Sequence, residues 1–161
     1  MNDDPLNIVL GNPQLRPSFT NQFSVSYSSF KIFDEQYFSI HTNFSNIHRP
    51  IVSNSFTDAV GRNIFRCDNP SDKSPNAYSV YSSFSKKLKK LNLHIGITLS
   101  SNGNVYYNIT NDELNRTISS SYNGSISLNC NIQRKYSIRV IVGPNSTHTE
   151  SSLQRQQNNN G

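Results

Sequence analysis

The feature that most constrains the fold is a period of two in hydrophobicity that runs through long segments. Along 91–99, leucine and isoleucine occupy every second position, and Asn, His, Gly and Thr lie between them. The same alternation recurs along 23–27, 38–44, 78–84, 122–132 and 136–142. Successive side chains of a β-strand point to opposite faces, whereas an amphipathic helix repeats every 3.6 residues. The alternation therefore predicts an all-β chain with one apolar and one polar face.

This alternation predicts about six long strands. They run at about 18–31, 36–57, 63–86, 90–110, 115–132 and 135–147. An average strand in a globular protein has about 5–6 residues, whereas a strand that crosses a bilayer at a tilt needs about 9–11 residues within the hydrocarbon. Each predicted strand is long enough to cross a bilayer.

The connections between the predicted strands alternate in character. Those at 32–36, 86–90 and 132–135 are short and charged, whereas the connection through 58–63 is flanked by the irregular stretch 67–76. Short turns on one side and longer loops on the other are typical of up-and-down barrels in the outer membrane. The segment 58–63 also fits a tight turn between long paired arms, so two interpretations of this connection remain open.

The two predicted faces suit different solvents. Only 34% of the residues are hydrophobic and 16% are charged, and Ser, Asn, Thr and Gln fill the polar phase. A soluble protein usually places many charges on its wet face, whereas a wide lumen can be lined by small neutral groups. The apolar phase of 91–99, 122–132 and 136–142 carries no charged residue, and a charge at the bilayer midplane costs about 2–4 kcal/mol.

Aromatic residues lie near the ends of the predicted strands, where the girdles of membrane barrels lie. They are Tyr37, Phe38, Tyr78, Tyr122 and Tyr136. Together these features favour an antiparallel up-and-down transmembrane β-barrel segment, an incomplete barrel of about six strands. The alternative is a soluble, secreted β-sandwich, a binding or adhesin-like module whose apolar phase faces a core.

The formal net charge of +5 does not by itself indicate a nucleic-acid partner. The densest basic run, Lys86, Lys87, Lys89 and Lys90, lies between two predicted strands. We expect a solvated turn there, because cations belong outside the hydrocarbon if both strands enter a bilayer. No nucleic-acid partner is therefore expected.

The sequence contains no recognisable constellation of catalytic or metal-binding residues. Cys67 and Cys130 are the only cysteines, and the four histidines are scattered without metal-ligand spacing. Unpaired cysteines packed as small hydrophobes are favoured over a disulfide, and the redox state of the two thiols stays open. We expect no enzyme activity, no cofactor and no metal, and we assign no catalytic or ligand-binding residue.

The start of the chain is punctuated by proline. Pro5, Pro13 and Pro17 fix the backbone and remove hydrogen-bond donors, so a rigid rim is expected here rather than a helix or a central strand. The full array reads Asp4-Pro5-Leu6-Asn7-Ile8, then Gly11-Asn12-Pro13, Leu15 and Pro17. With this array, nearly the whole chain resembles outer-membrane β-barrels of the TonB-dependent receptor type, of the Bacteroidetes-like outer membrane protein β-barrel family.

This resemblance implies a place in the bacterial outer membrane, in contact with its lipid bilayer. In the full-length protein it implies a plug domain, a TonB-type energy transducer as partner, and import of a scarce nutrient such as a siderophore, a cobalamin-like molecule or a glycan. Any ligand contacts are expected from loop residues near 62–76 and 111–115.

The resemblance also divides the chain into segments. Residues 1–17 are expected to be a rim or loop lead-in, 18–148 a partial outer-membrane β-barrel, and 149–161 a loop or a truncated end. A barrel of the transporter type has about 22 strands, so about six strands are expected to be an internal fragment. The acidic start lacks the apolar stretch of a signal peptide, and no run approaches the roughly 20 apolar residues of a transmembrane helix.

Overall fold

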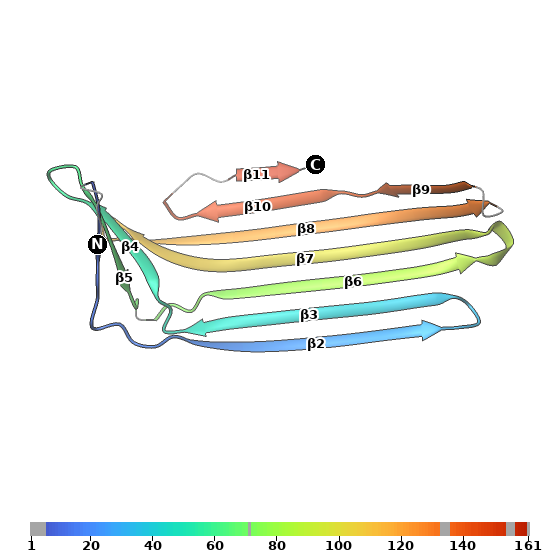
Figure 1. Cartoon of the computed structure of the whole chain (residues 1–161), viewed down its shortest axis with the longest axis horizontal. Coiled ribbons are helices and arrows are strands. Elements are labelled where there is room, and N and C mark those ends of the chain that lie inside the picture. Colours follow the sequence, from blue (N-terminus) through green and yellow to red (C-terminus); the bar gives the residue numbers. More distant parts are fainter. Residues whose placement is uncertain (1–5, 71, 133–135, 154–156, 161) are drawn as a thin grey trace.

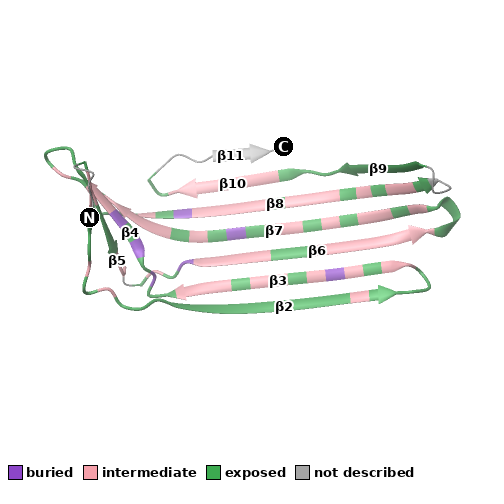
Figure 2. Ribbon diagram, viewed as in Figure 1, coloured by how far each residue is buried: buried purple, intermediate pink, exposed green. Residues whose placement is uncertain are grey.

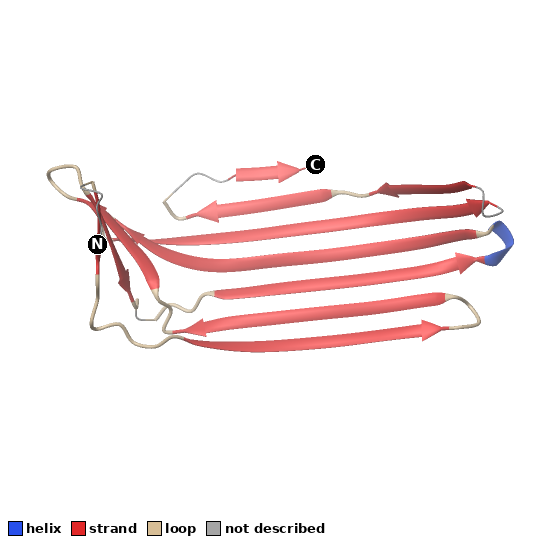
Figure 3. Cartoon of the chain, viewed as in Figure 1, coloured by secondary structure: helices blue, strands red, loops and turns tan. Residues whose placement is uncertain are grey.

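The strands of the chain form a single sheet (Figure 1). The computed structural model describes residues 6–70, 72–132, 136–153 and 157–160. The strands are β1 (Asn7–Leu10), β2 (Phe19–Lys31), β3 (Gln36–His48), β4 (Val52–Thr57), β5 (Asn63–Asp68), β6 (Asn76–Leu88), β7 (Leu93–Thr110), β8 (Glu113–Ile132), β9 (Tyr136–Val142), β10 (Asn145–Ser151) and β11 (Gln157–Asn160). The described residues contain one short 3-10 turn, η1 (Lys89–Leu91), and no other helix (Figure 3). None of the described residues belongs to a helix that is long and apolar enough to cross a membrane.

The registers of the long strands bring their apolar phases to one face. β2, β3, β6, β7 and β8 lie side by side and pair antiparallel. One row of directly opposed residues crosses the sheet through Phe38, Phe84, Ile97, Ile126 and Val142. Because opposed residues share a face, the period of two seen in each strand becomes a continuous apolar surface. The predicted all-β, antiparallel class is thus confirmed, although the sheet is not closed into a barrel.

Two of the predicted strands are each broken in two. The segment 36–57 is interrupted after β3, where Arg49 has a φ of 54° and Pro50 follows. The segment 63–86 is interrupted between β5 and β6 by a stretch that contains Pro70 and Pro75. Proline cannot donate to a strand ladder, so these two predictions were wrong at the prolines and correct on either side of them.

The predicted strand at 135–147 is also two strands, but they keep one register. Val142 of β9 lies opposite Ile126, and Asn145 of β10 lies opposite Asn123. Pro144 between them has no N–H to donate, while its carbonyl still accepts from the Gly124 N–H at 3.0 Å. β9 and β10 therefore act as one strand along β8 that continues to Ser151, into the segment 149–161 expected to be a loop.

The turns set the remaining strand boundaries. Asn92 has a φ of 47° after η1, so β7 begins at Leu93, and residues 86–88 of the expected connection belong to β6. Asn111 and Asp112 have φ values of 49° and 65° and join β7 to β8. Positive φ at both central residues is the signature of a tight two-residue hairpin turn. The longest hairpin of the sheet therefore ends in a compact tip.

The sheet has almost no core of its own. Val52 is the one hydrophobic residue that is buried in the part of the chain the structure describes, and few residues of the long strands are buried (Figure 2). Most large apolar side chains of this face are exposed. All described strands belong to one sheet, so no second layer covers this face. The β-sandwich alternative is wrong, because a sandwich needs two packed sheets.

The first strand lies within the segment expected to be a rim. β1 pairs parallel with β5, with Asn7 opposite Asn63, and it occupies an edge of the sheet. The expected turn at Asn12 is present: the Leu15 N–H donates to the Asn12 carbonyl at 3.3 Å, and the Gln14 N–H donates to Asn12 Oδ1 at 3.0 Å. This segment therefore crosses from β1, beside β5, to β2, beside β3 (Figure 1).

Candidate functional site

The stretch of the apolar face between Leu93 and the Tyr78 ring has the height of a membrane-facing band. On β7 the Tyr78 ring covers Gly103 so closely that a Cβ would lie 2.4 Å from Tyr78 Cε1, and the apolar phase resumes beyond it at Val105. The Ser101 hydroxyl donates to the Tyr78 hydroxyl at 3.4 Å. With a rise of about 3.4 Å per residue and a tilt of about 45°, the stretch from Leu93 to Gly103 spans a height of roughly 24 Å, close to the roughly 25 Å apolar band of outer-membrane barrels.

Four of the five aromatic residues expected in girdles lie on the apolar face. Tyr78 and Tyr122 lie in neighbouring rows at one border of the band, opposite Gly103 and Ser101 respectively. Tyr37 is the exception, because it lies opposite Ser85 on the polar face. The girdle expectation was therefore wrong for Tyr37.

The polar face carries rows of small hydroxyl and amide groups. One row of opposed residues crosses five strands through Ser28, Ser39, Ser83, Thr98 and Ser125. Its Ser39 and Ser83 hydroxyls lie 2.8 Å apart, and Ser39 is buried. The Ser39 and Ser83 hydroxyls therefore satisfy each other, and this row carries no charged side chain. Such rows can line water or another polar surface, but their side chains are too short to fill a wide interior.

At one end the sheet divides around a cavity. β6 begins opposite Val105 of β7, and further along β7 its place is taken by β4, where Asn54 lies opposite Ile109. A cavity of about 1140 Å³ opens at this division. Its lining comes from the lead-in after β1, the end of β3, the connection from β5 to β6, and Ile109 of β7. Four parts of the chain that are distant in sequence therefore meet at one place.

The side chain of Asn69 holds these segments together. The Arg16 N–H donates to Asn69 Oδ1 at 2.7 Å, and Asn69 Nδ2 lies within 3.1 Å of the Arg16 carbonyl. The same Nδ2 lies 3.3 Å and 3.2 Å from the carbonyls of Arg49 and Pro50. Asn69 thus fixes the lead-in against the corner where β3 ends, which explains how Arg49 keeps a backbone conformation that is costly outside glycine.

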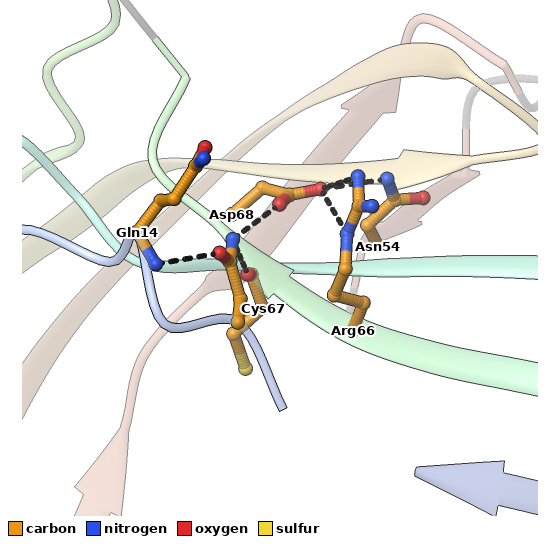
Figure 4. Close-up of polar contacts among 6 residues, drawn as sticks. Gln14, Asn54, Arg66, Cys67 and Asp68 are labelled. Carbon is orange, nitrogen blue, oxygen red and sulfur yellow. Dashed lines mark hydrogen bonds and ion pairs between the residues drawn. The ribbon is translucent and has the colours of Figure 1, made fainter. Parts of the chain in front are cut away.

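A second polar cluster centres on Asp68 (Figure 4). Arg66 Nη2 and Asn54 Nδ2 each donate to Asp68 Oδ2 at 2.8 Å, and Asn12 Nδ2 donates to Oδ1 at 2.9 Å. The Arg66 guanidinium, followed by the Asn54 amide, holds the pKa of the Asp68 carboxyl below its ordinary value of 3.8. Asn12 also donates to the Cys67 carbonyl at 2.9 Å. The cluster joins β4, β5 and the lead-in and neutralises the Asp68 charge.

Of the two regions predicted to contact a ligand, one lines the cavity and the other does not. Residues 68–70 and 72–74, within 62–76, line the cavity. The turn at Asn111 instead packs on β4, where its N–H donates to the Ser55 carbonyl at 2.9 Å, and it does not line the cavity. The lead-in and the end of β3 were missed as cavity-lining segments. Ligand contact itself remains a prediction for both regions.

The remaining described residues that could act as nucleophiles or metal ligands do not form a cluster. Cys67 is exposed, Cys130 is half-buried, and both are free. Within the described residues no group of three or more His, Cys, Asp or Glu side chains is placed to hold a metal ion. The cavity and the Asp68 cluster are therefore the features that could take part in recognition.

A long-stranded sheet with one lipid-compatible face and one neutral polar face defines a wall segment of a membrane β-barrel. The family model described as "Outer membrane protein beta-barrel family" matches residues 1–161, and the chain belongs to this family. No curated protein and no solved structure matches the chain. Membership places the protein in the bacterial outer membrane, with the apolar face of the sheet against the lipid bilayer.

Proposed function

We propose that these strands form part of the wall of a wide barrel of the TonB-dependent receptor type, which imports a scarce nutrient. The observation that carries the proposal is the polar face, whose rows consist mainly of Ser, Thr and Asn, with larger side chains such as Tyr37, His41 and Tyr81 at only a few positions. Side chains fill the interior of barrels of about 8 strands, whereas a barrel of about 22 strands encloses a plugged lumen. A wall of small neutral groups suits the second case.

The open edges of the sheet support a larger barrel. β2 pairs with β3 alone and β11 with β10 alone among the described strands, so each leaves one row of backbone groups unpaired. In lipid an unpaired backbone N–H or C=O costs several kcal/mol. We therefore propose that further strands complete the sheet at both edges in the full-length receptor.

The unequal ends of the sheet suggest its orientation. The described turns after β2 and β6 are short, and Glu35 of the first turn forms an ion pair at 2.8 Å with Lys87 near the end of β6. The opposite end carries the β4–β5 hairpin and the long extension of β7 and β8 (Figure 1). The cavity lies at the same end. Outer-membrane barrels have short turns on the periplasmic side and longer loops outside, so we place the cavity on the extracellular side.

The proposed role is transport and not catalysis. The chain would supply lipid-facing wall, lumen lining and part of the outer rim, while a plug domain and a TonB-type transducer in the complete system would gate and energise import. The proposed cargo is a siderophore, a cobalamin-like molecule or a glycan, and the residues that touch it remain unassigned.

Uptake in cells tests this proposal. Cells that lack the gene should lose accumulation of one labelled nutrient among a ferric siderophore, cobalamin and an oligosaccharide, and a plasmid copy should restore it. Collapse of the inner-membrane proton gradient should abolish the same uptake. Entry that persists after the gradient is collapsed would contradict a TonB-dependent receptor and indicate a passive pore.

A further inference from the structure

The cavity where the sheet divides carries more positive charge than its own carboxylates neutralise. Arg16, Arg49 and Lys73 line it, and within the described residues none of the three forms an ion pair. The Asp68 carboxylate also lines the cavity, but its charge is matched by Arg66 at 2.8 Å. Asp72 is the remaining acid of the lining. Three cations therefore face one uncommitted carboxylate.

The fold holds the backbones of two of these cationic residues in place, although the Arg16 and Arg49 side chains are exposed. The backbones of Arg16 and Arg49 are tied to one another through Asn69, with contacts of 2.7 Å and 3.3 Å. Lys73 is half-buried and follows Asn69 closely in sequence, in the connection from β5 to β6. Positive charges that line one recess repel one another, and a bound anion reduces that repulsion.

We propose that this cavity binds an anionic oxygen group, a phosphate or a carboxylate, between Arg16, Arg49 and Lys73. The planar guanidinium of an arginine donates two parallel hydrogen bonds to such a group, and a lysine adds a compact charge. Gln14 and Ser74 also line the cavity and supply neutral donors. The inference goes beyond the proposed transport role, because it holds whether or not the barrel imports a nutrient.

Two sources of the anion are compatible with the position of the cavity. His48 and Ile109 of its lining continue the phases of β3 and β7 that face lipid lower in the sheet. A phosphate borne by a lipid headgroup could therefore reach the cavity from the membrane surface. A soluble phosphate or carboxylate could reach it from the medium. The lipid-borne anion and the soluble anion present the same chemistry to the three cations.

Binding to the intact protein, purified from outer membranes, tests the inference in two arms. In the first arm, inorganic phosphate is titrated into the protein in neutral detergent and heat is measured at low salt. In the second, native mass spectrometry counts phosphatidic acid retained from phosphatidylcholine nanodiscs that contain it as a minor component. Binding in the first arm alone identifies a soluble anion, and binding in the second alone identifies a lipid headgroup. Saturable binding in either arm supports the proposal.

Variants decide whether the cavity is the binding site. Arg49→Asn removes the charge with a residue that tolerates positive φ, and we expect about a tenfold loss of affinity, the size of one charge-assisted contact. Lys73→Gln should also weaken binding, and it provides the test if Arg49→Asn fails to fold. Arg49→Lys should restore part of the affinity, because it keeps the charge without the planar fork.

The matched control is Arg62→Gln. Arg62 is an exposed arginine outside the cavity, and it is already paired with Asp58 at 2.7 Å. Its loss should leave binding unchanged. The proposal is overturned if neither arm detects binding by folded protein, or if Arg62→Gln weakens binding as much as Arg49→Asn, which would indicate a diffuse charge effect.

Discussion

At the scale of the residue, the close approach of β8 and β9 depends on one glycine. A Cβ on Gly143 would lie 1.8 Å from the Gly124 carbonyl oxygen, and backbone atoms there cannot move aside without breaking the strand pair. Gly124 faces a looser neighbourhood, where the nearest atom to an added Cβ is Leu99 Cδ2 at 3.5 Å. Two glycines in neighbouring rows of the sheet therefore have different physical roles.

We predict that Gly143→Ala destabilises the folded barrel by about 1–3 kcal/mol or more, the usual cost of overpacking. Gly124→Ala serves as the control and should change the free energy of unfolding by less than about 1 kcal/mol. Urea titration in lipid vesicles, read by the gel mobility of unheated samples, measures both. Equal effects of the two substitutions would mean that β9 does not approach β8 at Gly143 as closely as the structure indicates.

A second prediction at this scale concerns the pH dependence of the Asp68 cluster. The Arg66 guanidinium lowers the pKa of the Asp68 carboxyl in the folded state, so ionised Asp68 stabilises the β4–β5 hairpin above the ordinary value of 3.8. That contribution is lost as the pH falls through the lowered folded value. The measurement is the hydrogen-exchange rate of the β5 amides in wild type and in Asp68→Asn at the same pH. The ratio of the wild-type rate to the variant rate should rise as the pH falls below about 4. A ratio that stays constant would show that Asp68 does not hold the hairpin.

At the scale of the element, alternation predicted where strands run but not where they break. The apolar phases of β2, β3, β6, β7 and β8 were all recognised, because period two is a local property of the sequence. The breaks at Pro50, Pro70 and Pro75 were missed, since alternating residues on both sides gave the appearance of continuous strands. The parallel pairing of β1 with β5 had no signal in the sequence, because it joins segments with an unrelated chain between them.

The tip of the β7–β8 hairpin offers a prediction about an element. Asn111 and Asp112 both have positive φ, where glycine is at no disadvantage and β-branched residues are strained. We expect Asp112→Gly to leave stability unchanged or raise it by a few tenths of a kcal/mol, and Asp112→Val to lower it by about 1–2 kcal/mol. The same urea titration compares them. A tolerated Asp112→Val would exclude the two-residue turn and favour a longer loop.

At the scale of the whole molecule, the stability of the sheet depends on what covers its apolar face and its edges. Its apolar face lacks a partner layer, so lipid supplies what a core supplies in a soluble protein, and the edges at β1, β2 and β11 are open among the described strands, where the proposed further strands would pair. The face pattern was predictable from sequence, because it needs only local alternation. The cavity was not, because Arg16, Arg49 and Lys73 are separated by long stretches of chain and meet only where the sheet divides.

The last prediction tests the assignment of the two faces with neighbouring positions of β7. Ile97 lies on the apolar face between Phe84 and Ile126, and Thr98 lies on the polar face between Ser83 and Ser125. Ile97→Lys places a charge in the lipid and should cost about 2–4 kcal/mol near the midplane. Thr98→Lys adds the same side chain one residue away, toward a wet lumen, and should cost less than about 1 kcal/mol. Unfolding in vesicles by urea measures the difference. Because a register slip by one residue would exchange the two faces, the opposite order of stability would reverse the assignment of lipid and lumen across every strand of the sheet.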